Sequence, residues 1–139
     1  MKKILVAHDG SKYSQKAMKK AIELAAPFGA TLIVLSVVPE MRLTELSPID
    51  QERLREAMEK EAKKTLQKAK ISASKTKVPI KTIVKQGNAA DVIVETADRL
   101  RVGMIVIGSH GWHGVQRFLL GSISLNVVEQ SRRPVLVVK

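Results

Sequence analysis

The sequence predicts an α/β protein built on a five-stranded parallel sheet with helices on both faces. Five short apolar runs alternate with four stretches of helical spacing along the 139 residues, and this alternation is typical of parallel βαβ units. Aromatic residues make up only 3% of the chain, so the core must be aliphatic, as in parallel strands that helices cover. The length fits one domain over residues 1–139.

The first strand is expected in "KKILVAH", residues 2–8, which ends at the turn signal "DGS". Ser11 can then cap a helix that runs to about Phe28, with Gly29 as its C-cap. The core face of this helix is predicted to hold Ala17, Ala21, Leu24, Ala25 and Phe28. "TLIVLSVV", residues 31–38, is the second strand, and its apolar character throughout predicts that both of its faces are covered.

The second helix is expected to begin at Ser47-Pro48, because proline is favoured in the first helical turn, and to run to about Ile71. Its apolar face is predicted to hold Leu54, Met58, Ala62, Leu66 and Ala69. "PIKTIVK", residues 79–85, is the third strand. Its apolar positions include Ile80, Ile83 and Val84.

Asn88 is predicted to cap the third helix, with Asp91 in the first turn where the helix dipole favours a carboxylate. The apolar residues of this helix include Ile93, Ala97 and Leu100. "GMIVIG", residues 103–108, is the fourth strand. A last helix over about 122–131 and the fifth strand "PVLVV", residues 134–138, complete the order.

Four of the eight glycines, Gly108, Gly111, Gly114 and Gly121, lie at the end of the fourth strand and in the stretch that follows it. Ligands of open parallel sheets bind at the carboxyl ends of the strands, and glycine lets backbone N–H groups approach an anion. The next helix would begin near Gly121-Ser122, with free N–H groups that favour a phosphate. We therefore predict a phosphate cradle. A surface loop in which the glycines serve only turns is the alternative.

Asp9 ends the first strand and could accept hydrogen bonds from a ribose or a base, or it could be an ordinary turn residue before Gly10. Ser122 and Ser124 could add hydroxyl donors, and Arg117 a charge. A Rossmann fingerprint is excluded because "HDGSKYS" follows the first strand. A P-loop is excluded because no lysine separates Gly121 from Ser122. Efficient phosphoryl transfer is therefore not indicated.

The net charge of +11 raises the question of an anionic partner. The lysines are spread over the polar faces of helices among glutamates, and few aromatic residues could stack on bases, so nucleic-acid binding is not expected. No apolar run approaches the roughly 20 residues of a membrane span, and no membrane partner is expected. The absence of cysteine agrees with a cytoplasmic location. The three histidines predict neither a metal site nor a catalytic residue.

The spacing Gly108, two residues, Gly111, nine residues, Gly121-Ser122 resembles the G-x2-G-x9-G-[ST] signature of the universal stress protein family. "ILVAHDGS", "GNAADVIVETA" and "RRPVLVVK" resemble that family's first strand, third helix and last strand, so the resemblance covers the whole chain. It implies a Rossmann-like fold of the adenine nucleotide alpha hydrolase type with strand order 3-2-1-4-5. It also implies a nucleotide-dependent stress-response or signalling protein.

The resemblance further implies an ATP site, with Mg or Mn as the accompanying metal. Asp9 would contact adenosine, Ala7 and Val37 would line the adenine pocket, and Gly108 would lie near the ribose. The residues around the phosphates would be Gly111, His113, Gly114, Gly121, Ser122, Ile123 and Ser124. A slow ATPase or a self-phosphorylating enzyme is the alternative function.

A homodimer through the last strand, Val135 to Val138, is expected for two reasons. The family resemblance implies it, and this apolar strand would be a bare edge in the order 3-2-1-4-5, which invites pairing with a second chain.

Overall fold

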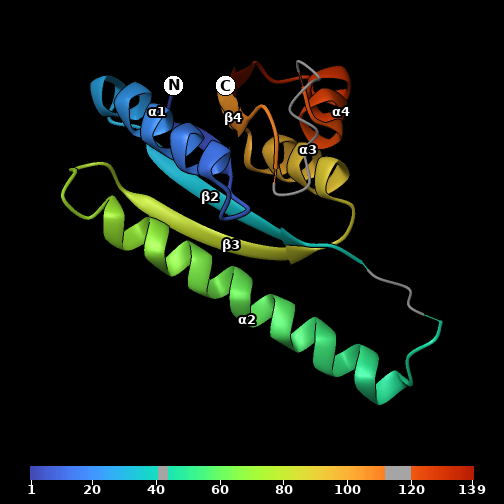
Figure 1. Cartoon of the computed structure of the whole chain (residues 1–139). Helices are drawn as coiled ribbons and strands as arrows, with labels where there is room; N and C mark the ends of the chain where they lie inside the picture. The colour runs from blue at the N-terminus through green and yellow to red at the C-terminus, as the bar shows by residue number, and fades with distance from the viewer. Residues whose placement is uncertain (41–43, 112–119) are drawn as a thin grey trace.

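The computed structural model describes residues 1–40, 44–111 and 120–139. Strands and helices alternate along the chain (Figure 1). Their bounds are β1 Lys3–Ala7, α1 Lys12–Phe28, β2 Thr31–Val38, α2 Pro48–Ser72, β3 Ile80–Gln86, α3 Ala89–Leu100, β4 Met104–Gly108, α4 Ser122–Gln130 and β5 Val135–Val138. The strands pair in parallel in the order β3-β2-β1-β4-β5, which confirms the predicted fold class and strand order. His113, Gly114 and Arg117 lie outside the described residues.

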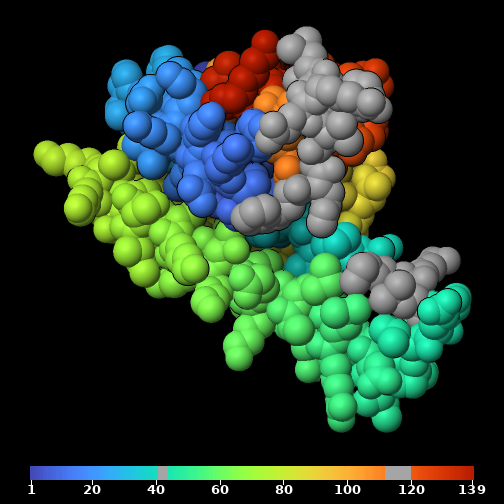
Figure 2. Space-filling model, in the orientation of Figure 1, coloured from blue at the N-terminus to red at the C-terminus, as the bar shows by residue number. Residues whose placement is uncertain are grey.

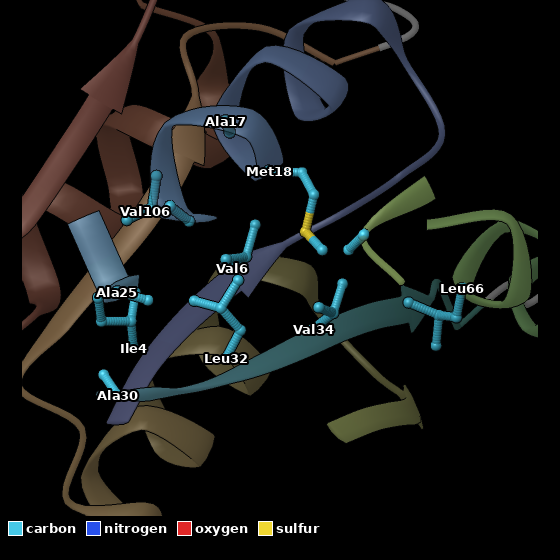
Figure 3. Packing of buried hydrophobic residues seen from close by; sticks show 12 residues of the cluster. Ile4, Val6, Ala17, Met18, Ala25, Ala30, Leu32, Val34, Leu66 and Val106 are labelled. Atoms are coloured by element: carbon cyan, nitrogen blue, oxygen red, sulfur yellow. The ribbon is translucent and has the colours of Figure 1, made fainter. Parts of the chain in front are cut away.

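Helices cover both faces of the sheet, because successive strand side chains point to opposite sides. On one face, α1 and α2 pack over Ile4, Val6 and Val34. Figure 3 shows Met18 of α1 and Leu66 of α2 on this face. On the other face, α3 and α4 pack with side chains such as Leu5, Leu35, Ile105 and Ile107. The mostly aliphatic side chains thus form two cores, one on each face of the sheet.

The helix caps form where the sequence predicts them. In three helices the N-cap side chain accepts a hydrogen bond from the N–H of the residue three positions on; these caps are Ser11, Ser47 and Asn88. Gly29 ends α1 in the left-handed region, at φ 62°, and its N–H donates to the carbonyls of Ala25 and Ala26. This confirms Gly29 as a C-cap, a position where a residue with a β-carbon is strained.

One prediction for the core of α1 was wrong. Phe28 is 59% exposed, because α1 ends at this residue and the chain turns at once through Gly29, so that no further helical turn covers the ring. Met18 is buried instead. In α2, Leu54 and Met58 are only half-buried. Figure 2 shows why: the first half of the helix projects from the body of the protein at the lower right.

The strand order reverses between β1 and β4. From β1 the chain moves outward through β2 to β3, and then returns to the other side of β1 with β4 and β5. In this class of sheet the reversal is the point where ligands bind, at the carboxyl ends of the two strands. Among the described residues, no helix is long and apolar enough to cross a membrane.

Candidate nucleotide-binding site

The carboxyl ends of β1 and β4 lie side by side, with Val6 opposite Val106 in the register. The loops that leave them are in close contact. A β-carbon added to Gly111 would lie 2.7 Å from Oδ2 of Asp9. The structure therefore brings together the aspartate after the first strand and Gly111 of the glycine stretch after the fourth, two features that the sequence singles out. A side chain at position 111 would occupy the space in front of this carboxylate.

Asp9 is exposed, and its carboxylate is held by the backbone that follows it. Oδ1 accepts a hydrogen bond from the N–H of Ser11 at 2.9 Å, which is the geometry of an Asx turn. Gly10 sits between them at φ 85°, where glycine is favoured. The same turn places Ser11 as the cap of α1. This short segment thus fixes the carboxylate just beyond the carboxyl end of β1.

The start of α4 lies against the loop that leaves β4. Gly121 is its N-cap, in an extended conformation and with no side-chain capping bond. Its N–H donates to the carbonyl of Ser109, and the Ser124 hydroxyl donates to the same oxygen at 2.8 Å. The helix is therefore tied directly to the loop after β4. The first N–H groups of a helix without a capping side chain, at the positive end of the dipole, are suited to bind an anion.

The other predicted site residues fall into two groups. Ala7 and Val37 are half-buried at the carboxyl ends of β1 and β2, and Ser122 and Ile123 are exposed in the first turn of α4. Gly108 and Ser124 are already engaged within the protein. A β-carbon on Gly108 would lie 2.8 Å from the Tyr13 backbone, and Ser124 is buried. The ligand contacts of these residues stay predictions.

The first turn of α1 contributes residues that the sequence reasoning did not assign to the site. The rings of Tyr13 and His110 lie 5.2 Å apart between centroids. The ammonium groups of Lys12 and Lys16 lie 5.5 and 5.8 Å from the centroid of the Tyr13 ring. His110 Nδ1 is 2.9 Å from the Ser109 hydroxyl. Cationic and aromatic groups thus gather beside the glycine loop, a juxtaposition that no spacing in the sequence reveals.

His8, whose role the sequence leaves open, is buried beneath this site. Its Nδ1 accepts a hydrogen bond from the N–H of Gly10 at 3.1 Å and lies 3.2 Å from the Ser14 hydroxyl oxygen. Accepting from a backbone N–H requires a lone pair on Nδ1, so the neutral ring carries its proton on Nε2. Burial lowers the pKa of His8, and the nearby Asp9 carboxylate partly opposes this by raising it. The folded protein therefore favours neutral His8.

This environment predicts a loss of stability in acid. Between about 6.5, the usual pKa of histidine, and the lower folded pKa, the unfolded chain binds the proton and the folded chain does not. The free energy of unfolding should fall with decreasing pH there, by at most about 1.4 kcal/mol per pH unit. Urea unfolding of the parent and of His8→Asn at pH 7.5 and 5.5 measures this. An equal loss in both proteins would show that His8 is not the cause.

A hollow of about 250 Å³ lies between the first half of α2 and the carboxyl ends of β2 and β3. Its lining residues are Pro39, Pro48, Gln51, Glu52, Leu54, Arg55, Met58 and Gln86. Arg55 pairs with Glu52 and Glu59. The hydrogen bond with Arg55 lowers the pKa of Glu52, and the same contact raises the pKa of Arg55. Because the Arg55 guanidinium is already paired with these two carboxylates, this hollow suits a nucleotide phosphate less well than the start of α4.

The model of the Universal stress protein family matches residues 1–139. The chain belongs to the universal stress protein family. Two relatives are each 36% identical to it: Universal stress protein MJ0531 of Methanocaldococcus jannaschii, with 99% of this chain and 82% of the relative covered, and Universal stress protein YxiE of Bacillus subtilis, with 99% and 98% covered. These identities confirm the family that the glycine spacing indicates.

Solved structures agree with this membership. The structure of protein MJ0577, also a Methanocaldococcus jannaschii universal stress protein, superimposes with a TM-score of 0.87 at 31% identity, covering 99% of this chain and 95% of that one. UspA from Lactobacillus plantarum gives 0.91 at 25% identity, with 99% and 97% covered. A universal stress protein in complex with cAMP gives 0.63 at 27% identity, with 99% and 95% covered.

Proposed function

We propose that this universal stress protein binds ATP in the crevice between the carboxyl ends of β1 and β4. The observation that supports this best is the contact between Asp9 and Gly111, because it joins a fixed carboxylate to the glycine loop. A carboxylate accepts hydrogen bonds from ribose hydroxyls, and the glycine loop and the start of α4 offer backbone donors to phosphate. The cAMP complex of a related universal stress protein supports an adenine nucleotide as the ligand class.

The proposed pose places the adenosine moiety over the half-buried Ala7 and Val37, with its ribose at Asp9. The phosphates lie toward Gly111 and the first turn of α4. There we assign the contacts to backbone N–H groups and to the exposed hydroxyl of Ser122. Ser124 has a positioning role, because its hydroxyl is buried and donates to the Ser109 carbonyl. His113 and Gly114 are proposed phosphate neighbours outside the described residues.

We propose that a Mg or Mn ion arrives with the nucleotide rather than on a site of its own. Among the described residues, no group of three or more histidine, cysteine, aspartate or glutamate side chains could hold a metal ion. A metal of this kind is often bound through substrate phosphates with few protein carboxylates, and Asp9 is a carboxylate within the crevice. Omitting the divalent ion should weaken ATP binding without changing the melting temperature of the free protein.

Binding rather than rapid turnover is the proposed activity. No lysine separates Gly121 from Ser122, so the lysine that a P-loop uses in phosphoryl transfer is missing there. His8 is buried and hydrogen-bonded to the backbone, so it is not arranged to drive phosphoryl transfer either. The test combines two assays. ATP with Mg²⁺ should raise the melting temperature at millimolar concentration, while released phosphate should stay near one per site per hour or below. Fast phosphate release would favour the ATPase, and labelled protein would favour self-phosphorylation.

We further propose a homodimer through β5. Among the described residues β5 has a neighbour only on its β4 side. The carbonyls of Pro134 and Val138 accept hydrogen bonds from β4 and the loop after it. Since alternate residues of a parallel strand point their backbone groups to the same side, Val135 and Val137 direct theirs to the free edge. A second copy could pair with this edge and bury its apolar side chains.

Val137→Pro is expected to turn the dimer into a monomer, because proline removes an outward N–H without removing a bond to β4. Light scattering should then give 15.3 kDa instead of twice that mass. Thr82→Pro is the matched control on β3, the other edge strand: the bonds of Pro79 and Gly87 to β2 place Thr82 on the outward-facing side. A monomeric parent, or an unchanged mass for Val137→Pro, would contradict the proposed interface.

The hydrogen bonds of Ser109 suggest how the nucleotide would influence the dimer. Its carbonyl accepts from Gly121 and Ser124 at the start of α4, and its N–H donates to the carbonyl of Val138 in β5 at 2.8 Å. One residue thus joins the proposed phosphate site to the proposed dimer edge. We infer a cytoplasmic stress-response or signalling protein in which ATP occupancy biases the dimer surface.

A further inference from the structure

The edge of the sheet at which the strands begin, here called the amino edge, gathers positive charge. In Figure 1 the last turns of α1 and α2 and the turn before β3 lie at the left, while the arrowheads of β2 and β3 point to the right. The cations at the start of β1, in the last helical turns and in the segments that lead from a helix to the next strand are Lys2, Lys3, Lys70, Lys75, Lys77, Arg99, Arg101, Arg132 and Arg133. All of them are exposed except Arg133, which is half-buried.

Hydrogen bonds connect these segments across the sheet. The carbonyl of Lys2 accepts from Thr31 at the start of β2, and the carbonyl of Pro79 accepts from Leu32. The Lys3 ammonium donates to the carbonyl of Leu100 at the end of α3. Parallel strands require this arrangement, because all of them begin at the same edge. Cations far apart in the sequence therefore form one surface.

Little negative charge offsets this surface. The carboxylates in the same terminal turns of the described helices are Asp98 and Glu129. Asp98 is already paired with Arg133 at 3.1 Å. Eight exposed cations thus remain against one exposed carboxylate, so the amino edge holds most of the protein's net charge of +11.

Large apolar side chains are exposed on the same edge. Phe28 ends α1 and is 59% exposed, Ile71 lies in the last turn of α2 and is 60% exposed, and Met1 is 44% exposed. Phe28 and Ile71 are exposed to solvent, although each belongs to a helix that buries other side chains against the sheet. Exposed cations that surround protruding apolar side chains are typical of surfaces that bind the interface of an anionic bilayer.

We propose that the amino edge is a docking surface for an anionic phospholipid bilayer. The lysine and arginine side chains bind headgroups, while Phe28 and Ile71 insert into the interface. A nucleic-acid backbone would satisfy the cations but would leave these two side chains in water. This proposal departs from the expectation of no membrane partner, which rested on the lack of a spanning segment and on the spread of the lysines along the sequence; a peripheral contact needs no spanning segment. Docking by this edge leaves the proposed nucleotide crevice, at the opposite edge, facing water.

Vesicle co-sedimentation of the full chain tests the proposal. Vesicles of phosphatidylcholine with about 30% phosphatidylserine should bind the protein at least about ten-fold more tightly than phosphatidylcholine alone. Raising the salt to about 1 M should release most of it, because screening then acts within about 3 Å. A protein that ignores both kinds of vesicle, or that binds duplex DNA but not the anionic vesicles, would overturn the proposal.

Matched variants test whether vesicle binding depends on the amino edge or only on the net charge of the protein. Phe28→Ser combined with Ile71→Ser should weaken vesicle binding about ten-fold, whereas Ile49→Ser, at an exposed site at the opposite end of α2, should not. Lys75→Ser with Lys77→Ser should weaken binding more than Lys60→Ser with Lys64→Ser, which removes equal charge from the middle of α2. Equal effects within either pair would overturn the proposal. Cooperative thermal unfolding serves as the readout that each variant is folded.

Discussion

Gly111→Val is expected to lower the affinity for ATP about a hundred-fold, equivalent to about 2.7 kcal/mol, while the sheet and its two cores remain intact. The first atom of the new side chain would lie 2.7 Å from Oδ2 of Asp9, so either the carboxylate or the glycine loop must move. Both belong to the proposed site. Gly121→Val should act similarly, because it places a branched side chain 3.2 Å from the Ser109 carbonyl at the start of α4.

Gly29→Ala is the control for these variants. Gly29 adopts φ 62°, and a β-carbon there would have nothing within 4 Å, so the cost is the left-handed backbone alone, about 1 kcal/mol. Its melting temperature should fall and its affinity for ATP should stay unchanged. Calorimetric titration and thermal unfolding of all three variants give both quantities. Parent-like binding by Gly111→Val and Gly121→Val would refute the cradle, and unfolding of both would show that these glycines are structural.

Asp9→Ala is expected to have the second large effect, a loss of about thirty- to a hundred-fold in affinity. A hydrogen bond to a charged acceptor contributes about 1.5–3 kcal/mol, and the substitution also releases the Ser11 N–H that Asp9 binds at 2.9 Å. Asp9→Asn keeps an acceptor for that N–H but loses the charge, so its affinity should lie between those of Asp9→Ala and the parent.

The exposed Asp50, in the first turn of α2, provides the matched control for Asp9. Asp50→Ala removes the same charge at a distance from the crevice and should leave the calorimetric affinity as in the parent. If Asp9→Ala also binds ATP normally, Asp9 is only an ordinary turn residue before Gly10 and does not contact the nucleotide. If Asp50→Ala weakens binding as much as Asp9→Ala does, the effect is one of net charge.

The strands and helix caps could be predicted because they depend on local patterns. Ser11, Ser47 and Asn88 each precede a helical period, and Gly29 follows one, so each cap is visible in the sequence. Phe28 was misplaced because periodicity identifies the face of a helix but not where the helix ends relative to the sheet. The half-burial of the first half of α2 escaped prediction for the same reason.

The candidate site was predictable only where it depends on position along the chain. Asp9 and the glycine loop follow strands, and the strand order brings them together. The contact of Gly108 with the Tyr13 backbone, and the role of Ser109 between α4 and β5, depend on the approach of segments that share no local pattern. The lysines were interpreted as solvated helix faces, because only the topology brings the cations of the amino edge together.

An NMR titration of the labelled protein with ATP and Mg²⁺ tests most directly whether the nucleotide occupies the crevice between β1 and β4. We predict the largest amide shifts at Asp9, Gly111 and the first turn of α4, residues Ser122 to Ser124, and small shifts along the amino edge. Two results would contradict this prediction: an unchanged spectrum at millimolar ATP, or shifts confined to the hollow beside α2 around Arg55 and Gln86.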